Sequence, residues 1–299
     1  MPPIAKVPHV LPYQGSKRLL APAIARYLRA AGPVGRLYEP FCGSAAVTLY
    51  VAQHGLARCF VLGDSLPAVV GLWRQVSESP DAVAGHFAAL HADQTATGPG
   101  HYERVRDRFN SHQDPKDFLW LCARCVKNAV RFGQGGLFNQ SPDRRRSGTQ
   151  PRRMATHIQA ASRLLRGRTE FRVGDWQQTL HDAGPRDLAY LDPPYFGTSV
   201  GADPRYHQGL DRDRLVDGLR SLRDRGVRVI LSYDGRTGSR DYGKALPADL
   251  GLVRLELDAG RSAQATLLGR SERTIESLYV SESLFACAHA QVPLRAISA

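Results

Sequence analysis

The residues best suited to chemistry in this chain are Asp192, Pro193, Pro194 and Tyr195. They follow the apolar run 188–191, which predicts a buried strand that ends abruptly, because proline fixes φ and removes a backbone donor. The turn would present a carboxylate, carbonyl oxygens and an aromatic ring. Such a set suits a flat ring that carries an amino group, although an Asp-Pro turn with a tyrosine packed on the core would leave the same pattern.

A second candidate turn covers residues 40–45 (Pro-Phe-Cys-Gly-Ser-Ala) and contains Gly43. A strand-to-helix turn with glycine lets a ligand approach backbone amides and a helix N-terminus. The turn lacks both the GxGxxG spacing of dinucleotide sites and the lysine of a P-loop. A phosphate cradle is therefore not the expected use.

Single acidic residues end two further predicted strands. Asp64 follows the apolar run 59–62 and is positioned to accept the hydroxyls of a ribose. An N-cap for the following helix is an equal alternative. Asp175, which lies shortly after Phe171, has the same two interpretations.

The elements that must position these residues alternate between strand and helix. The predicted strands are 36–39, 58–64, 170–175, 187–192 and 227–232, and the predicted helices are 45–53, 67–77, 176–181 and 211–225. This alternation predicts a mostly parallel sheet covered on both faces, with ligands beyond the carboxyl ends of its strands. Period-2 patterns at 253–257 and within 275–280 predict a terminal β-hairpin.

The alternation stops between residues 78 and 168. Helices are expected at 102–109 and 116–130, followed by a glycine- and arginine-rich stretch at 133–153 that predicts a basic hairpin or loop. Residues 124–172 hold twelve basic residues against two acidic ones, so they carry most of the net charge of +12. A solvated loop is one explanation, but binding to a phosphate backbone explains the asymmetry better. We expect an inserted domain at 78–168 within a domain formed by 1–77 and 169–299.

Cysteine usage and hydropathy limit the remaining classes. The five cysteines are scattered, and Cys122 and Cys125 are expected to be core residues on a helix rather than metal ligands. No run approaches 18 apolar residues, and the first residues lack a signal-peptide pattern. The expected protein is soluble and cytoplasmic, with no metal ion and no membrane partner.

The order of these motifs resembles that of the DNA adenine methylase family of AdoMet-dependent N6-adenine methyltransferases. The similarity runs from about residue 11 to residue 235. The motifs that carry it are 13–17 (Tyr-Gln-Gly-Ser-Lys), 39–44, Asp64, Phe171 with Asp175, and 192–195; in the insert they are Asn128, Arg131, Phe132, Gly136, Phe138 and Asn139, and 232–234 follow. The resemblance implies a Rossmann-like, mixed but mostly parallel sheet of the class I methyltransferase type, with an inserted, mainly helical target-recognition domain.

The resemblance also implies roles for individual residues. Asp192, Pro193, Pro194 and Tyr195 would grip the target adenine. S-adenosylmethionine would be bound by Tyr13, Lys17, Glu39, Phe41, Gly43, Ser44, Asp64, Phe171 and Asp175. Duplex DNA would be bound by Asn128, Arg131, Asn139, Arg144, Arg145, Arg146, Arg152 and Arg153. A monomer that flips its target base out of the duplex is favoured.

Three departures from the family pattern leave alternatives open. Ala45 stands where the last glycine of the turn is expected, the recognition segment matches only in patches, and residues 143–146 (Asp-Arg-Arg-Arg) have no counterpart. The same fold could act on N4 of cytosine in DNA or on adenine in RNA. It could also serve as a DNA-binding protein with little turnover.

Overall fold

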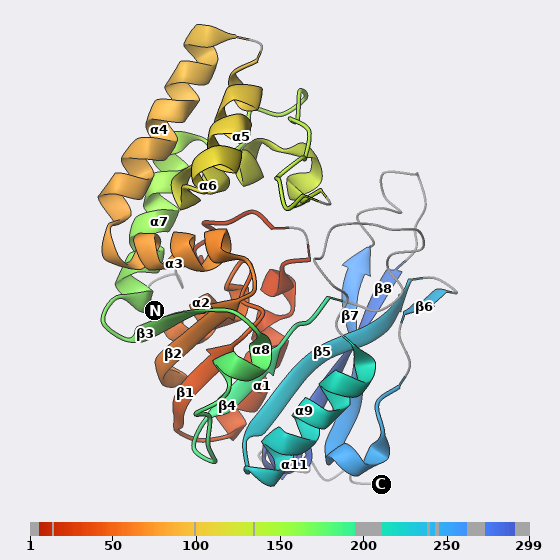
Figure 1. Cartoon of the computed structure of the whole chain (residues 1–299). Helices are drawn as coiled ribbons and strands as arrows, with labels where there is room; N and C mark the ends of the chain where they lie inside the picture. Colours follow the sequence, from red (N-terminus) through yellow and green to blue (C-terminus); the bar gives the residue numbers. More distant parts are fainter. Residues whose placement is uncertain are drawn as a thin grey trace, which may run out of the picture.

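A single mixed sheet organises the molecule (Figure 1). The computed structural model describes residues 6–13, 15–98, 100–133, 135–194, 211–237, 240–242, 245–261 and 273–290. The strand order is β3-β2-β1-β4-β5-β8-β7, and β6 pairs with β5 off this path. The strands are β1 (Val34–Glu39), β2 (Ala57–Asp64), β3 (Thr169–Val173), β4 (Leu188–Leu191), β5 (Arg228–Thr237), β6 (Arg240–Tyr242), β7 (Leu252–Arg261) and β8 (Arg273–Ser281).

The five strands from β3 to β5 are mutually parallel, whereas β8 runs antiparallel to both β5 and β7. The predicted mixed, mostly parallel sheet and its terminal hairpin are therefore confirmed. The order reverses at β1, which pairs with β2 on one side and with β4 on the other. Ligand sites in such sheets lie beyond the carboxyl ends of the strands at this switch point.

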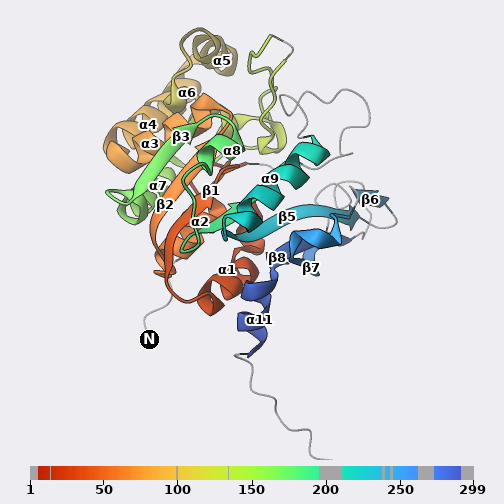
Figure 2. The ribbon, with the colours of Figure 1, turned by 60° about the horizontal axis from the view of Figure 1, so that its bottom comes forward.

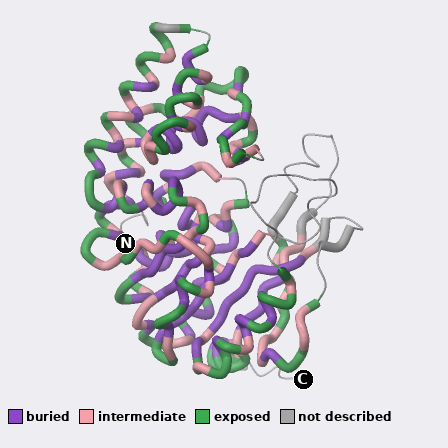
Figure 3. The backbone as a smooth tube through the Cα atoms, viewed as in Figure 1, coloured by how far each residue is buried: buried purple, intermediate pink, exposed green. Residues whose placement is uncertain are grey.

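Two apolar layers hold the sheet because successive side chains of a strand point to opposite faces. Leu37 and Phe60 belong to the larger buried cluster, whereas their neighbours Tyr38 and Val61 belong to the smaller one. The smaller cluster is completed by α8 (Trp176–Thr179) and α9 (Arg212–Asp224). Figure 2 shows α9 on one side of the sheet and α1 on the other, and Figure 3 shows the buried residues concentrated in the strands and in the helix faces turned toward them.

The larger cluster extends without a break from the sheet into the helices of the insert. The helices that contribute residues to this larger cluster are α1 (Ala21–Ala30), α2 (Ala46–Gln53), α3 (Pro67–Glu78), α4 (Pro80–Thr97), α5 (His101–His112), α6 (Pro115–Arg124), α7 (Pro151–Leu165) and α11 (Glu282–Ala290). Three short 3₁₀ turns are η1 (Lys17–Leu19), η2 (Val126–Asn128) and η3 (Ala248–Leu250). The division into a catalytic domain and an insert at 78–168 stays a prediction.

Two expectations for the insert are wrong in detail. The helix expected to reach residue 130 ends at Arg124, because Lys127 and Asn128 adopt positive φ of 59° and 50°. The basic stretch expected to run to residue 153 ends earlier, because Arg152 and Arg153 lie in the first turn of α7. Proline at the first helical position favours that start at Pro151, and the helix pattern of α7 was missed because arginines fill its exposed face.

The cysteines expected in the core are buried there. Cys122 lies on α6 and Cys125 ends it, and the Cys125 thiol points to the carbonyl of Cys122. Burial raises the pKa of Cys125 to about 12, so the thiol stays neutral. Among the described residues, no three His, Cys, Asp or Glu side chains are grouped as metal ligands would be. No helix in the described ranges has the length and apolar character needed to cross a membrane.

Candidate active site

Three carboxylates end three adjacent strands at the switch point. Asp64 ends β2, Glu39 ends β1, and Asp192 follows the last residue of β4. Parallel strands deliver their carboxyl ends to one edge of a sheet, so these three acids lie together at that edge, where the strand pattern predicts a ligand site. Pro193 and Pro194 follow Asp192 and end the strand, whereas Tyr195 lies outside the described residues.

Asp192 is held by a lysine from a distant part of the chain. The Lys17 ammonium lies 3.0 Å from Oδ1 of Asp192 and 3.5 Å from Oε2 of Glu276, and the Lys17 side chain is only 7% exposed. Burial raises the pKa of Asp192 to about 6, although Lys17 opposes this rise. The family resemblance predicts Lys17 as a cofactor ligand. It does not predict the contact of Lys17 with Asp192 or with Glu276.

Glu39 is buried beneath the start of α2. Its side chain is 3% exposed, and Oε2 accepts the backbone N–H of Thr48 at 3.0 Å. Burial raises the pKa of this carboxyl to about 8, against the lowering effect of its hydrogen bonds to Thr48. Glu39 therefore joins the end of β1 to the first turn of α2, whether or not a ligand also contacts it.

The glycine turn is fixed from several sides. Oδ2 of Asp64 accepts the N–H of Gly43 at 3.1 Å, and the indole N–H of Trp73 donates to the Gly43 carbonyl at 2.8 Å. The hydroxyls of Ser16 and Ser44 lie 2.8 Å apart, which attaches the segment before Lys17 to the same turn. Trp73 belongs to none of the sequence motifs, because its role depends on its contact with Gly43, thirty residues away in the chain.

The predicted ligands Tyr13 and Gly43 are neighbours. A Cβ on Gly43 would lie 3.6 Å from the Tyr13 ring, and φ at Gly43 is +41°. The distance is an ordinary van der Waals contact, so it is the left-handed backbone that favours glycine at this position. Gln14, the next residue of that motif, lies outside the described residues.

Ala45 adopts the conformation that glycine would adopt more easily. Its φ is +48° and ψ is +33°, which is left-handed, and its side chain is fully buried in the larger apolar cluster. Instead of crowding a ligand, this methyl group packs in the core. The departure from the family pattern appears as backbone strain at the N-cap of α2.

Phe171 lies in the middle of β3, and Asp175 lies two residues beyond the end of that strand. The Asp175 carboxylate accepts the N–H of Gln177 at 2.9 Å as the N-cap of α8 and pairs with Arg214 at 2.9 Å. The N-cap alternative for Asp175 is confirmed, and binding of a ligand by this residue stays a prediction. Phe171 is half-buried against the larger cluster.

Phe41 lies on the same side of the site as α8. Its ring stacks on that of Trp176, with centroids 6.1 Å apart and the planes inclined by 29°. Trp176 is itself buried, so the Phe41 ring is held from one side. The turn that contains Phe41 is thus fixed to the second apolar layer as well as to the first.

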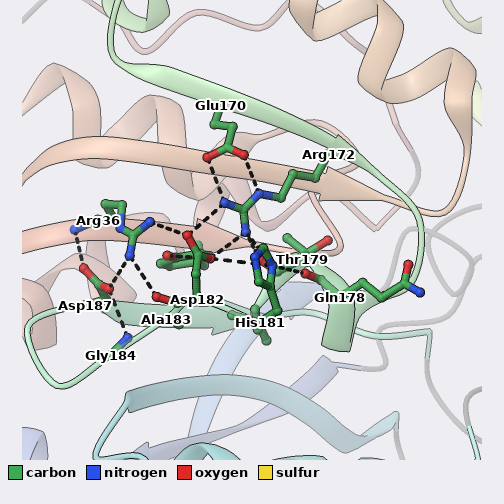
Figure 4. A network of polar contacts seen from close by, with 12 residues as sticks. Arg36, Glu170, Arg172, Gln178, Thr179, His181, Asp182, Ala183, Gly184 and Asp187 are labelled. Atoms are coloured by element: carbon green, nitrogen blue, oxygen red, sulfur yellow. Dashed lines mark hydrogen bonds and ion pairs between the residues drawn. The ribbon is translucent and has the colours of Figure 1, made fainter.

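A separate polar network braces the strands beneath this edge (Figure 4). Arg172 on β3 and Arg36 on β1 both bind the carboxylate of Asp182, at 2.7 Å and 2.6 Å. Hydrogen bonds from Arg172 hold the pKa of Asp182 well below its usual range, with support from Arg36 and Tyr38. Arg172, one of the twelve basic residues of segment 124–172, therefore has a structural role.

A short hairpin joins residues 131–133 to 137–139 and carries one basic residue, Arg131; the basic residues expected in a hairpin or loop at 133–153 lie instead at 144–146 and in the first turn of α7. Phe132 and Phe138 pair as an antiparallel bridge, and the N–H of Asn139 donates to the carbonyl of Arg131 at 3.0 Å. The Phe138 ring packs edge-on against those of Phe109 and Phe118, which fixes the hairpin on α5 and α6. Asn139 is exposed on it.

Other predicted DNA ligands divide into structural and exposed groups. The Asn128 amide donates to the Cys122 carbonyl at 2.9 Å, which holds the turn after α6, and Arg146 pairs with the buried Asp143. Residues Arg144, Arg145, Arg152 and Arg153 are exposed, and Arg131 is half-buried. Arg124, Arg166 and Arg168, which also add to the charge of the segment, donate to main-chain carbonyls of the fold.

Comparison with known proteins identifies the family of the chain. Residues 13–262 match the model of the D12 class of N6 adenine-specific DNA methyltransferases. A DNA N-6-adenine-methyltransferase of Escherichia phage P1 is 26% identical over 78% of this chain, which spans 30% of that protein's length. The retron Ec67 DNA adenine methylase of Escherichia coli is 25% identical, over 75% of this chain and 76% of its own.

The type II methyltransferase M1.LlaDCHI of Lactococcus lactis subsp. cremoris is 23% identical, over 89% of this chain and 94% of its own. The matched range contains the glycine turn, the carboxylates at the strand ends, the hairpin at 131–139 and Asp192 with its two prolines. The strand order and the mixed sheet are those of a class I methyltransferase fold. The chain belongs to the D12 class of N6 adenine-specific DNA methyltransferases.

Proposed function

We propose that this protein transfers a methyl group from S-adenosylmethionine to the N6 amino group of adenine within a specific sequence of duplex DNA. The observation that carries the proposal is the partly buried Asp192 carboxylate at the carboxyl end of β4, next to the turn that contains Gly43. The target base would be flipped out of the duplex, since its amino group is otherwise inside the stack. The protein would act as a monomer on cytoplasmic DNA.

The residues at the strand ends fit the proposed methyl donor. Glu39, Asp64 and Asp192 are buried or half-buried carboxylates whose pKa values burial raises to about 8, about 6 and about 6. A cationic ligand favours the ionised form of such groups, and the donor carries a sulfonium and an ammonium. Gly43 and Ser44 would lie along its amino-acid part with Tyr13 and Phe41, and Asp64 would accept its ribose hydroxyls. Phe171 and Asp175 would flank its adenine.

Asp192 would act on the target amino group as an acceptor. The lone pair of an aromatic amine is delocalised into the ring, so hydrogen bonds from its N–H groups to Asp192 and to the Pro193 carbonyl favour a nitrogen that can attack. When bound, S-adenosylmethionine would supply an activated methyl group: the amine lone pair would form the new C–N bond, the C–S electrons would return to sulfur, and the surplus N–H proton would pass to water. Positioning and electrostatics then carry the catalysis, and no metal ion is needed because the methyl group is already activated.

The exposed arginines of the insert would hold the DNA during base flipping. Arg144 and Arg145 lie in the loop after the hairpin, and Arg152 and Arg153 lie on the first turn of α7. Charged contacts to phosphates position a duplex, whereas contacts to base edges select the sequence. We assign the phosphate contacts to these arginines. Contacts to the edges of the nucleobases are assigned to Arg131 and Asn139 on the hairpin. Asn128 would support the turn from which the hairpin starts.

One experiment tests the proposal against its alternatives. The protein is incubated with radiolabelled S-adenosylmethionine and duplex DNA of mixed sequence, and the DNA is digested to nucleosides. Label in N6-methyladenine supports the proposal. Label in N4-methylcytosine, or transfer to RNA alone, would replace it with the other methyltransferase activities. DNA binding without any transfer would leave a DNA-binding protein on this fold.

A further inference from the structure

We propose that Glu276 on β8 is a positioning residue for the transfer reaction. It shares the Lys17 ammonium with Asp192, and so it fixes the place and the charge of the Asp192 carboxylate where the target amino group must bind. The inference rests on the proposed function of Asp192 as an acceptor.

The three charged groups come from separate parts of the fold. Lys17 begins η1, Asp192 follows β4, and Glu276 lies in β8. The ammonium is 3.0 Å from Asp192 and 3.5 Å from Glu276, and the two carboxylate side chains are 20% and 18% exposed. Lys17 also donates to the Gly15 carbonyl at 3.3 Å. The ammonium is therefore held in place, and both carboxylates meet it away from bulk water.

The backbone of β5 brings Glu276 to this position. The register of β5 against β8 shifts between Ser232 and Gly235, and Gly235 then pairs with Glu276. A Cβ on Gly235 would lie 2.5 Å from the Ile275 carbonyl oxygen, so the close approach of the strands requires glycine.

The same bulge is fixed by a buried side chain. Asp234 has a φ of +56°, which is unusual for a residue other than glycine, and it is 5% exposed. Its carboxylate accepts the hydroxyl of Tyr279 on β8 at 2.8 Å. The strain at Asp234 and the bond to Tyr279 therefore set the register that delivers Glu276.

The charges around Asp192 act in opposite directions. Burial raises the pKa of Asp192 most, Lys17 lowers it, and Glu276 raises it, with about 6 as the result. Glu39, at the end of the neighbouring strand β1, is a further acid that interacts with Asp192. Without Glu276, the ammonium would lose one of its two carboxylate partners, bind Asp192 more strongly and compete with the substrate amine for the oxygens of Asp192. Without Lys17, the pKa of Asp192 would rise and more of its carboxyl would be protonated, which reduces its capacity to accept.

Two substitutions should therefore shift the acid limb of the profile of kcat against pH in opposite directions. We expect Glu276→Gln to lower kcat at least tenfold and to move the acid limb of its pH profile down by about one pH unit. Lys17→Gln should move that limb up by about one pH unit, and Lys17→Arg, which keeps the charge, should restore it. A role for Glu276 in folding alone would lower activity without moving the limb. Glu256→Gln on β7, which removes an exposed acid, is the matched control.

The same shifts should be seen without turnover. The carboxyl carbon of Asp192 can be followed by NMR against pH in the free protein, with Asp192→Asn used for assignment. Its midpoint should fall in Glu276→Gln and rise in Lys17→Gln. Gly235→Ala, which displaces β8 at Ile275, should act in the same direction as Glu276→Gln.

Midpoints that stay unchanged, or that move the same way in both variants, would overturn the inference. If the unaltered protein transfers no methyl group to adenine, the proposed function fails, but the NMR titration still decides whether Glu276 and Lys17 control Asp192. The two failures are therefore distinguishable.

Discussion

Oδ2 of Asp64 accepts the backbone N–H of Gly43 at 3.1 Å, while Oδ1 accepts that of Leu66 at 3.0 Å. One carboxylate thus joins the end of β2 to the turn after β1. The same carboxylate is the candidate ligand for a ribose, so its structural and binding roles must be separated by experiment.

Asp64→Asn keeps an oxygen acceptor but removes the charge. We expect the affinity for S-adenosylmethionine, measured by calorimetry, to fall about 10-fold to 100-fold, because hydrogen bonds to a charged acceptor contribute about 1.5–3 kcal/mol. Asp175→Asn is the matched comparison and should cost less, since Arg214 and the start of α8 already bind that carboxylate. An unchanged affinity in Asp64→Asn would leave this residue with its structural role alone.

Asp192→Asn should abolish transfer while sparing the methyl donor. The neutral amide cannot replace a charged acceptor, so kcat should fall about 100-fold or more. The affinity for S-adenosylmethionine should change only a few-fold. Single-turnover kinetics and calorimetry measure the two quantities, and Asp217→Asn, at an exposed position of α9, controls for loss of a charge. Turnover retained by Asp192→Asn would contradict the acceptor mechanism.

Glu39→Gln should change how stability depends on pH. Burial raises the pKa of Glu39 from 4.5 to about 8 in the folded protein, so folding retains a proton that the unfolded chain releases. The free energy of unfolding contributed by this group therefore falls as pH rises from about 4.5 to 8, by at most about 1.4 kcal/mol per pH unit. Glutamine still accepts from Thr48 but removes this slope.

Urea denaturation of the free protein between pH 5 and pH 8 measures the effect. Asp182→Asn is the contrasting control, because its arginine partners hold its pKa below the usual range and its stabilisation is lost only as pH falls toward acid. That variant should be less stable across the whole window with an unchanged slope. An equal slope in Glu39→Gln and in the unaltered protein would show that Glu39 is ionised in the folded state.

Ala45→Gly should stabilise the protein by about 0.5–1 kcal/mol. The left-handed backbone at φ +48° costs an alanine about 1–2 kcal/mol, which exceeds the extra unfolded-state entropy of glycine. Ala46→Gly, one residue later within α2, should instead be neutral or destabilising. Thermal and urea unfolding measure both. Destabilisation of Ala45→Gly beyond that of Ala46→Gly would mean that the buried methyl outweighs the backbone strain.

Arg144→Ala combined with Arg145→Ala should weaken DNA binding and its dependence on salt. Neutralising one phosphate contributes about 0.9 to the slope of log affinity against log salt, so the slope of the double variant should be shallower by up to about 2. Arg146 is left in place because it pairs with Asp143. Arg163→Ala, at an exposed position near the far end of α7, controls for the loss of one positive charge outside the loop, against which each single variant, Arg144→Ala and Arg145→Ala, is compared. Equal slopes in the double variant and the unaltered protein would show that Arg144 and Arg145 lie in a solvated loop that does not contact phosphates.

Local patterns predicted the parallel strands, their order of appearance and the acids that end them. Nearly continuous apolar runs mark β1, β2, β4 and β5 because parallel strands that are buried on both faces need apolar side chains on both. Two prolines mark the end of β4 because proline fixes φ and has no backbone N–H to donate. The long helices α4 and α7 were not predicted: alanine and polar residues surround the apolar positions of α4, and α7 keeps an apolar face, formed by Met154, Ile158, Ala161 and Leu165, but lies within the arginine-rich segment.

The sequence by itself therefore determined which residues sit at the ends of the strands, and through their motifs the family of the protein. Only the tertiary structure decided which side chains surround them. Lys17 and Glu276 meet Asp192 because a 3₁₀ turn, a parallel strand and an antiparallel strand converge at one edge. No local pattern encodes that meeting, since it depends on strand order and on the bulge at Gly235, which are set when distant segments pack together.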